Sequence, residues 1–391
     1  MDTKFTRRSF VKALLAATAG LSLPGRPARA ASTEAFSFVL LGDLHFDRLT
    51  HHDLDWLRKE KPDDFRQVQN YSRLTAEILP TLFATLRETV ARSNRSPEKP
   101  VAFAIQAGDF VEGLCGTVEL ASRQNTEAIA FVRESKLSVP FLFTKGNHDI
   151  TGPGAPEAFK AVFRPFLSEQ SAGFTGGGKL AAANYAIEHA GALICFFDAY
   201  DKENLAWLEA TLAQRTARHC FVIVHPPVVP YGARSTWHLY SGERNQAQRE
   251  RLLDLLGKHN AFVLSGHIHK YSLLVRATPR GGRLLQLAVS SVMSEPKVVP
   301  RHALTGVASY NADQVKVEPD FSPATETQRR AVYEAEARFV KQFQYADLPG
   351  YAVVEVNGPS VTARVYAGAG QQVWRALELT RLLDGSARTA G

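Results

Sequence analysis

Residues 36–45, with the sequence FSFVLLGDLH, decide the fold: an apolar run of strand length is followed at once by a glycine, a carboxylate and an imidazole. The same arrangement, a polar cluster directly after an apolar run, returns further along the chain. In order, the clusters are Gly42-Asp43-Leu44-His45, Gly108-Asp109, Gly146-Asn147-His148-Asp149, His225 and Gly266-His267-Ile268-His269. In layered α/β folds ligands gather beyond the carboxyl ends of the strands, and every cluster is expected there.

Together the clusters supply the ligand types of a site for two metal ions. A pair of divalent metals about 3.5 to 4 Å apart needs a bridging ligand, and a carboxylate with two oxygens provides one. Neutral imidazoles and a carboxamide oxygen fill other positions without adding anionic charge. Asp43 and His45 are two residues apart, as are His267 and His269, so each pair is expected to point one way from an extended strand end. The preceding glycines should allow sharp turns and leave room beside the metals.

Taken alone, most of these clusters also fit a purely structural interpretation. A Gly-Asp pair after a strand is most often a turn, and a solitary His225 is more often a hydrogen-bonded structural imidazole. His267 and His269 alone could be a fragment of a mononuclear zinc site. Residues 146–149 are harder to attribute to chance, because a specified tetrapeptide occurs about once in 10⁵ positions. The ordered set, behind predicted strands, favours a metal site.

The clusters resemble the motifs of the calcineurin-like metallophosphoesterase superfamily, namely Asp-x-His, Gly-Asp, Gly-Asn-His-Asp/Glu, a lone His and Gly-His-x-His. The resemblance spans residues 36 to about 290, and every motif is intact. It implies Asp43, His45 and His269 as ligands of one metal ion, Asn147, His225 and His267 as ligands of the other, and Asp109 as the bridge. These ligand types suit manganese, iron or zinc.

The resemblance also assigns a role to His148, which would contact the phosphate and protonate the leaving oxygen while Asp149 orients its ring. The implied activity is hydrolysis of a small phosphate ester by a metal-bridging hydroxide. Family analogy favours a phosphodiester, with a phosphomonoesterase and a non-catalytic metal-binding scaffold as alternatives. Glu112 stands where the purple acid phosphatase branch has a tyrosine ligand, so that branch is not expected.

The N-terminus predicts export. The motif TRRSFVK at residues 6–12 precedes an apolar stretch, residues 13–23, that is too short to span a bilayer. The paired arginines match a bacterial twin-arginine (Tat) signal, and ARA at residues 28–30 resembles a cleavage site. We therefore expect residues 1–30 to be a signal peptide that engages the Tat export machinery. The mature protein would be periplasmic or secreted, without a transmembrane anchor.

Removal of residues 1–30 makes the charge nearly neutral. The chain has 46 Lys and Arg and 39 Asp and Glu, of which six and one lie in residues 1–30, so 40 and 38 remain. This balance gives no strong signal for nucleic-acid or membrane-surface binding and disfavours a nuclease. Cys115, Cys195 and Cys220 do not suggest a disulfide framework, although one bridge could form after export.

Alternating strands and helices predict an αββα sandwich, two packed sheets flanked by helices, for residues 31–294. Strands are expected near residues 36–41, 101–106, 140–144, 184–188, 192–198, 219–224, 261–265, 271–276 and 284–289. Helices are expected near residues 69–93, 117–136, 156–168, 202–214 and 245–258.

Residues 295–391 predict a C-terminal extension that completes or flanks the sandwich, with a separate small subdomain as the alternative. Prolines and polar residues make residues 295–322 irregular, and a charged helix is expected at 325–345. Strands at 351–356 and 360–366 are joined by Asn-Gly, a strong hairpin signal.

The loop at residues 226–245 is a candidate for substrate contacts. Its aromatic and basic side chains could stack on a base and bind a second phosphate substituent, or could equally pack the loop onto the sheet. These residues are Tyr231, Arg234, Trp237, His238, Tyr240 and Arg244. His51 and His52 either line the mouth of the cleft or are solvated.

Overall fold

The computed structural model describes residues 35–95, 98–232, 235–311 and 325–387. The predicted signal peptide, residues 1–30, lies outside these ranges. Within them, no helix combines the length and the apolar character needed to cross a membrane.

The first sheet is built around the strand that opens the sequence argument. Its order is β14 (Val373–Leu377), β13 (Ser360–Ala367), β12 (Gly350–Asn357), β1 (Phe36–Leu41), β2 (Val101–Gln106) and β3 (Phe141–Phe143). Strands β1, β2 and β3 run parallel, so their carboxyl ends lie at one edge. The predicted C-terminal hairpin is confirmed, and β12 pairs antiparallel with β1.

The second sheet is also mixed. Its order is β10 (Ala303–Thr305), β11 (Val340–Ala346), β8 (Tyr271–Ala277), β9 (Arg283–Ala288), β7 (Phe262–Ser265), β6 (His219–Ile223), β5 (Ala192–Phe196) and β4 (Tyr185–His189). Strands β5, β6, β7 and β9 are parallel. The ends of β6 and β7 therefore place their following loops side by side.

Strand β6 shows how the sequence builds the layers. Its side chains are buried on both faces, as expected for an inner strand of a covered sheet. Phe221 and Ile223 belong to the core between the sheets, whereas Cys220 and Val222 belong to the core under the outer helices. The ring of Phe221 meets that of Phe38 on β1 with centroids 5.5 Å apart, so the two sheets pack face to face.

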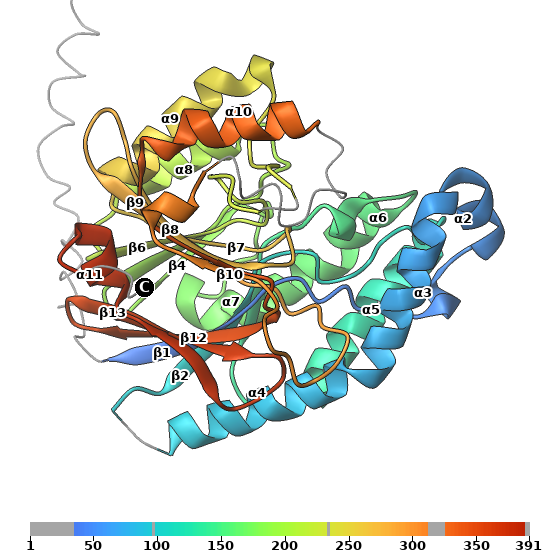
Figure 1. The fold of residues 1–391 in the computed structure, drawn as a ribbon. Helices are drawn as coiled ribbons and strands as arrows, with labels where there is room; N and C mark the ends of the chain where they lie inside the picture. Colours follow the sequence, from blue (N-terminus) through green and yellow to red (C-terminus); the bar gives the residue numbers. More distant parts are fainter. Residues whose placement is uncertain (1–34, 96–97, 233–234, 312–324, 388–391) are drawn as a thin grey trace, which may run out of the picture. The chain divides into compact units, whose positions relative to one another are not determined.

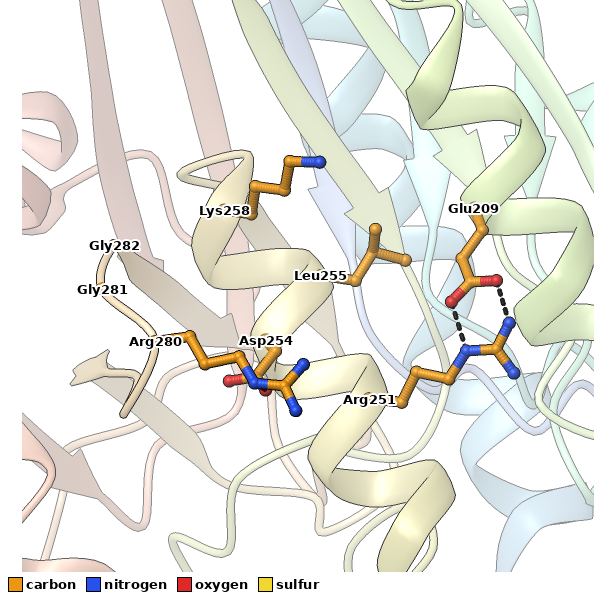
Figure 2. Close-up of a pocket in the computed structure, with 8 residues that line it drawn as sticks. All are labelled: Glu209, Arg251, Asp254, Leu255, Lys258, Arg280, Gly281 and Gly282. Carbon is orange, nitrogen blue, oxygen red and sulfur yellow. Dashed lines mark hydrogen bonds and ion pairs between the residues drawn. The ribbon is translucent and has the colours of Figure 1, made fainter.

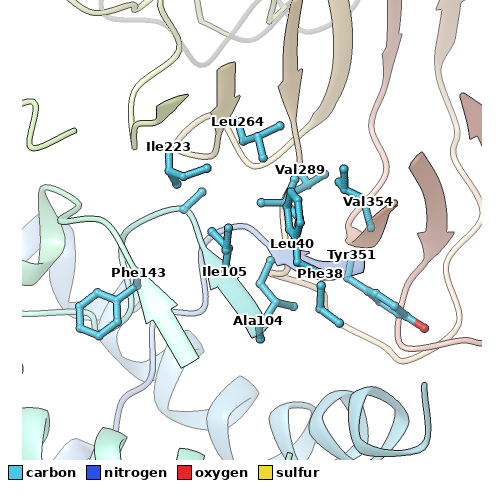
Figure 3. Packing of buried hydrophobic residues seen from close by; sticks show 14 of the residues in the cluster. Phe38, Leu40, Ala104, Ile105, Phe143, Ile223, Leu264, Val289, Tyr351 and Val354 are labelled. Atoms are coloured by element: carbon cyan, nitrogen blue, oxygen red, sulfur yellow. The ribbon is translucent and has the colours of Figure 1, made fainter. Parts of the chain in front are cut away.

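Figure 3 shows the inner core from close by, with Phe38 and Leu40 of β1 near Ile105 of β2 and with Ile223 and Leu264 from the second sheet. All five side chains are fully buried. At about 25 cal/mol per Å² of buried apolar surface, this interface is a main source of stability for the sandwich.

Helices cover the outer faces of both sheets (Figure 1). The helices are α2 (Leu54–Glu60), α3 (Pro62–Glu77), α4 (Leu79–Asn94), α5 (Val118–Glu134), α6 (Ala155–Ala158), α7 (Arg164–Thr175), α8 (Asn204–Ala213), α9 (Gln246–Lys258), α10 (Glu326–Ala337) and α11 (Leu379–Asp384). Leu82 and Leu86 of α4 belong to the same hydrophobic cluster as the residues between the sheets. Leu208 of α8, Leu256 of α9 and Tyr333 of α10 belong to the cluster under the outer helices that also contains Cys220 and Val222. This is the predicted αββα arrangement.

Two of the predicted helices were wrong in their bounds, and several short elements were not predicted. The helix expected at 325–345 ends at Ala337, because residues 340–346 form β11 and pair with β8. The helix expected at 69–93 is two helices that meet at Ile78, with Pro80 in the first turn of the second. The short elements α2, β14 and α11 were not predicted from the sequence.

Candidate metal centre

The predicted ligands come from both sheets and converge at one edge. Asp43 and His45 follow β1, Asp109 follows β2 and Asn147 follows β3, whereas His225 follows β6 and the pair His267 and His269 follows β7. Among the residues that the structure describes, three groups of side chains each have ligand atoms within 4.8 Å of one another. The groups are Asp43, His45 and His269; His45, Asp109 and His148; and Asp109, His225 and His267.

The first half of the centre joins the ends of β1 and β7. The Nε2 atoms of His45 and His269 are 3.0 Å apart, and Nε2 of His269 lies 3.4 Å from Oδ1 of Asp43. These are the three residues that the sequence grouped on one metal ion.

The second half joins the ends of β3, β6 and β7. Nε2 of His225 lies 3.1 Å from Oδ1 of Asn147 and 3.0 Å from Nδ1 of His267. The structure therefore also brings together the other predicted trio.

Asp109 lies between the two halves. Its Oδ2 is 3.0 Å from Nε2 of His225 and 3.8 Å from Nε2 of His45. Its Oδ1 accepts a hydrogen bond of 2.8 Å from the backbone N–H of His148. A single carboxylate is thus within reach of both ligand groups, as a bridge requires.

The backbone geometry of the ligands differs from the prediction. His45, Asp109, His267 and His269 have φ values of 46°, 56°, 74° and 56°. These residues are left-handed rather than extended, so the simple alternation of a strand does not explain why their side chains converge. Non-glycine residues in this region carry strain of order 1–3 kcal/mol each and cluster at functional sites.

Two glycines permit the close approach of the motifs. A Cβ on Gly146 would lie 2.1 Å from the backbone nitrogen and 2.2 Å from Oδ1 of Asp109. Gly108 has a φ of 92°, and a Cβ there would lie 2.7 Å from the ring of His225. The room that these glycines leave is occupied by neighbouring ligands.

The pKa values of the predicted ligands bear on whether the site can bind metal cations. Burial alone would raise the pKa of Asp43, but His269 and His225 lower it to about 2. Burial and the neighbouring His225 lower the pKa of His267 to about 3, so its imidazole is neutral. Burial alone would lower the pKa of His225, but Asp109 raises it to about 9, so a bound ion would have to displace a proton from that ring. Buried carboxylates in the ionised form and neutral imidazoles are the protonation states that metal binding requires. The donor set therefore fits a dinuclear metal centre.

Glu112 contacts two residues of the candidate site, and the motif analysis gave it no role there. It is fully buried, and its Oε2 lies 2.7 Å from Nδ1 of His45 and 3.3 Å from Nδ1 of His148. Gln67 donates a 2.9 Å hydrogen bond to its other oxygen. A carboxylate behind a metal-binding histidine fixes the tautomer and direction of the ring. A signal for it was present in the sequence, an acidic residue three positions after Asp109.

The ring of His148 is not oriented by Asp149, contrary to the prediction. Nδ1 of His148 donates to the backbone carbonyl of Glu112 at 2.8 Å. The Asp149 carboxylate instead accepts hydrogen bonds from backbone N–H groups, including those of Phe110 at 2.9 Å and Gly146 at 2.7 Å. Asp149 thus ties the loop after β2 to the loop after β3. Burial and Asp109 raise its pKa to about 7.

Most side chains of the loop at 226–245 pack inward. Tyr231 and His238 are buried, and the hydroxyl of Tyr240 donates to Asn204 at 2.8 Å. Trp237 is different, since it is 51% exposed and its ring centroid lies 4.3 Å from that of His267. Arg234 lies outside the described residues, and Arg244 is exposed in a short 3-10 turn, residues 243–245.

His51 and His52 are buried, so neither prediction for them was correct. Nε2 of His52 lies 2.7 Å from Oδ1 of Asp47, and Nε2 of His51 lies 3.0 Å from Oε2 of Glu127. Both imidazoles belong to a polar network in the interior. The cysteines of the chain, Cys115, Cys195 and Cys220, are buried and unpaired.

A separate surface pocket lies between α8, α9 and the turn after β8 (Figure 2). Its charged residues pair with one another, Arg251 with Glu209 and Arg280 with Asp254 at 3.1 Å. None of the predicted metal ligands lines it. The pocket is therefore not part of the metal centre.

The fold and the candidate ligands match the type of domain that the sequence motifs predicted. The family model described as calcineurin-like phosphoesterase matches residues 36–271 of the 391, and the chain belongs to this family. The match ends just beyond His269, so it contains every predicted ligand. No curated protein sequence matches the chain.

Solved structures that are similar to the chain have low sequence identity to it. The purple acid phosphatase PPD1 from seeds of yellow lupin (Lupinus luteus) has a TM-score of 0.50 and 12% identity, with 89% of this chain and 54% of the lupin chain covered. The chain thus spans about half the length of that enzyme. PhoD has a TM-score of 0.48 and 13% identity over 90% of this chain and 70% of its own. A dimetal phosphatase from Danio rerio has 0.47 and 12%, over 88% and 99%.

Proposed function

We propose that the protein is an exported phosphodiesterase that uses a dinuclear metal centre to hydrolyse a small phosphate diester. The observation that carries the proposal is the position of Asp109, whose Oδ2 lies between His225 at 3.0 Å and His45 at 3.8 Å. One carboxylate shared by two groups of imidazole and carboxylate ligands is the arrangement of a two-metal site.

The ligands divide into two groups around this bridge. Asp43, His45 and His269 would hold one ion. Asn147, His225 and His267 would hold the other. When bound, the ions would supply Lewis acidity toward the phosphoryl oxygens and lower the pKa of water at the site.

His148 is positioned to act on the leaving oxygen. The carbonyl and the carboxylate of Glu112 both lie near its Nδ1, at 2.8 and 3.3 Å. Both are acceptors, so Nδ1 carries a proton and the ring presents Nε2 as its second proton-exchanging atom. Donation of a proton from Nε2 would neutralise the alkoxide that departs when the P–O bond breaks. Glu112 also contacts His45, and therefore couples the position of the acid to that of a ligand.

Export and diester preference rest on sequence features and family analogy. The twin-arginine motif at residues 6–12 supports passage through the Tat machinery to the periplasm or beyond. The motif resembles the signal of a pathway that transports proteins already folded, so metal ions would be inserted in the cytoplasm before transport. The preference for a diester follows the analogy alone.

The test compares a diester with a monoester on the same protein. Mature protein, residues 31–391, would be loaded separately with manganese, iron or zinc and assayed with bis(p-nitrophenyl) phosphate and p-nitrophenyl phosphate. A higher kcat/KM for the diester supports the proposal. A higher value for the monoester makes the protein a phosphatase. Inactivity on both with two ions bound points either to a more demanding natural substrate or to the non-catalytic scaffold.

A further inference from the structure

Trp237 is placed unlike the other aromatic residues of its loop. Its indole is 51% exposed, yet the ring centroid lies 4.3 Å from the imidazole centroid of His267, with 56° between the ring planes. A large apolar side chain is thus left in contact with water beside a predicted metal ligand.

The residues that directly flank Trp237 are well anchored. Thr236, His238 and Leu239 on either side of it are buried. The N–H of Leu239 donates to the carbonyl of Pro227 at 2.8 Å, and Nδ1 of His238 pairs with the carbonyl of Thr236 at 2.7 Å. The exposure of Trp237 is therefore a property of its position and not of a loosely packed segment.

An indole in this position can stack on a second ring in addition to that of His267. One part of it contacts His267, and the exposed part offers an apolar, electron-rich surface next to the place where the phosphate would bind. Planar rings stack on tryptophan with a gain equivalent to roughly 5- to 150-fold in affinity. Because His267 would ligate a metal ion, a ring stacked on Trp237 would belong to the same molecule as the bound phosphate.

We propose that Trp237 is a specificity-determining stacking platform for a planar aromatic ring in the organic part of the substrate. This inference rests on the proposed function and narrows its substrate class to phosphoesters that carry a nucleobase or an aryl group. Trp237 itself takes no part in bond breaking.

The competing explanation is that Trp237 only supports the ring of His267. The two roles predict different effects of replacing Trp237. If Trp237 supports His267, its loss should lower metal content and reduce turnover of every substrate alike. If it is a stacking platform, its loss should reduce turnover only of substrates that carry a ring. The ratio between ring-bearing and ring-free substrates therefore separates them.

The experiment uses phosphate diesters that share one methyl ester and differ in the other ester group, which is thymidine, phenyl or methyl, so that the methyl diester, dimethyl phosphate, carries no ring, and turnover is followed by phosphorus NMR. They would be compared on the manganese-loaded wild-type protein and on W237F, W237L and W207L, the last being the same change on α8. We expect the ratio of kcat/KM for the thymidine or phenyl diester over the methyl diester to fall roughly 5- to 150-fold in W237L. W237F should keep most of the ratio, and W207L all of it.

A binding measurement makes the inference independent of turnover. Calorimetric titration with adenosine 5′-monophosphate and with methyl phosphate should show tighter binding of the nucleotide, and W237L should remove that difference while metal content stays the same. An equal fall for all three diesters in W237L, or equal binding of the two monoesters by the wild-type protein, would overturn the stacking role. Inactivity of the wild-type protein on all diesters, with nucleotide binding still dependent on Trp237, would refute the proposed function and leave the platform standing. A preference for thymidine over phenyl would identify a nucleoside as the source of the ring, and the reverse an aryl group.

Discussion

Oε2 of Glu112 lies 2.7 Å from Nδ1 of His45, in a buried position directly behind a predicted metal ligand. The contact holds the proton on Nδ1 and leaves Nε2 to face the centre. Loss of such a partner typically reduces metal affinity 10- to 100-fold.

We therefore expect E112Q to bind metal roughly 10- to 100-fold more weakly than the wild-type protein, measured by competition with a chelating dye. E119Q on the exposed first turn of α5 is the matched control and should bind metal normally. Unchanged affinity in E112Q would show that the His45 ring is oriented without the carboxylate.

His148 should affect turnover and not metal binding. We expect H148A to keep its metal content and to lose roughly 10²- to 10⁴-fold in kcat, since a general acid contributes about that much. Metal content by mass spectrometry and kcat with bis(p-nitrophenyl) phosphate would be measured on the same sample. Full turnover at equal metal content would refute the role of His148 as the acid.

Gly146 tests the tight contact between the motifs after β2 and β3. A Cβ at this position would lie 2.1 Å from the backbone nitrogen of Asp109, so G146A should destabilise the protein by about 1–3 kcal/mol and reduce metal binding. G173A within α7 is the control, because nothing lies within 4 Å of its new Cβ. Urea unfolding should show G173A to be as stable as the wild-type protein or slightly more so. If both variants unfolded at the same urea concentration, the loop at Gly146 would have to adjust freely.

His238 should make the stability of the fold sensitive to acid. Burial, with Arg249 nearby, lowers its pKa to about 4, whereas the unfolded value is about 6.5. The unfolded chain therefore takes up a proton first. The neutral buried ring contributes its full stability above pH 6.5, and this contribution is lost as the pH falls toward 4.

The expected loss from His238 between pH 7 and pH 4.5 is roughly 2 kcal/mol. We expect the free energy of unfolding of metal-free H238Q to fall less over this range than that of the metal-free wild-type protein. H302Q, at an exposed histidine, should follow the wild-type curve. Parallel curves for H238Q and the wild-type protein would mean that His238 stays neutral in both states or charges without cost.

Much of the fold, and the set of residues that the structure brings together at the candidate site, could be predicted from the sequence. The apolar runs before Gly42, Gly108 and Gly146 predicted the parallel strands of the first sheet. Because each motif directly follows one of these strands, the sequence also predicted that the motifs meet at the edge formed by the carboxyl ends. The directions of the side chains could not be predicted in this way. His45 and His267 converge through left-handed backbone conformations, which depend on the whole loop and leave no periodic pattern.

The roles of Asp149 and Glu112 show the same limit. A motif gives the residue types but not their hydrogen-bond partners, so Asp149 was matched to the neighbouring His148 although its carboxylate faces backbone N–H groups. Glu112 acts across a contact that only the packed loops create. Strand β11 was missed because it follows α10 after only two residues and is defined by its pairing with β8, which is distant in the sequence.

The division of the ligands between the two sheets has a consequence for the protein as a whole. Ions held by Asp43 and Asp109 on one side and by His225 and His267 on the other would join layers that otherwise meet chiefly through apolar side chains. Binding that requires both layers in place stabilises the folded chain in proportion to the logarithm of the free ion concentration. The stability of the folded protein should therefore vary with the concentration of free metal ions around it. A shortage of the ion would shorten the lifetime of the molecule as well as abolish its activity.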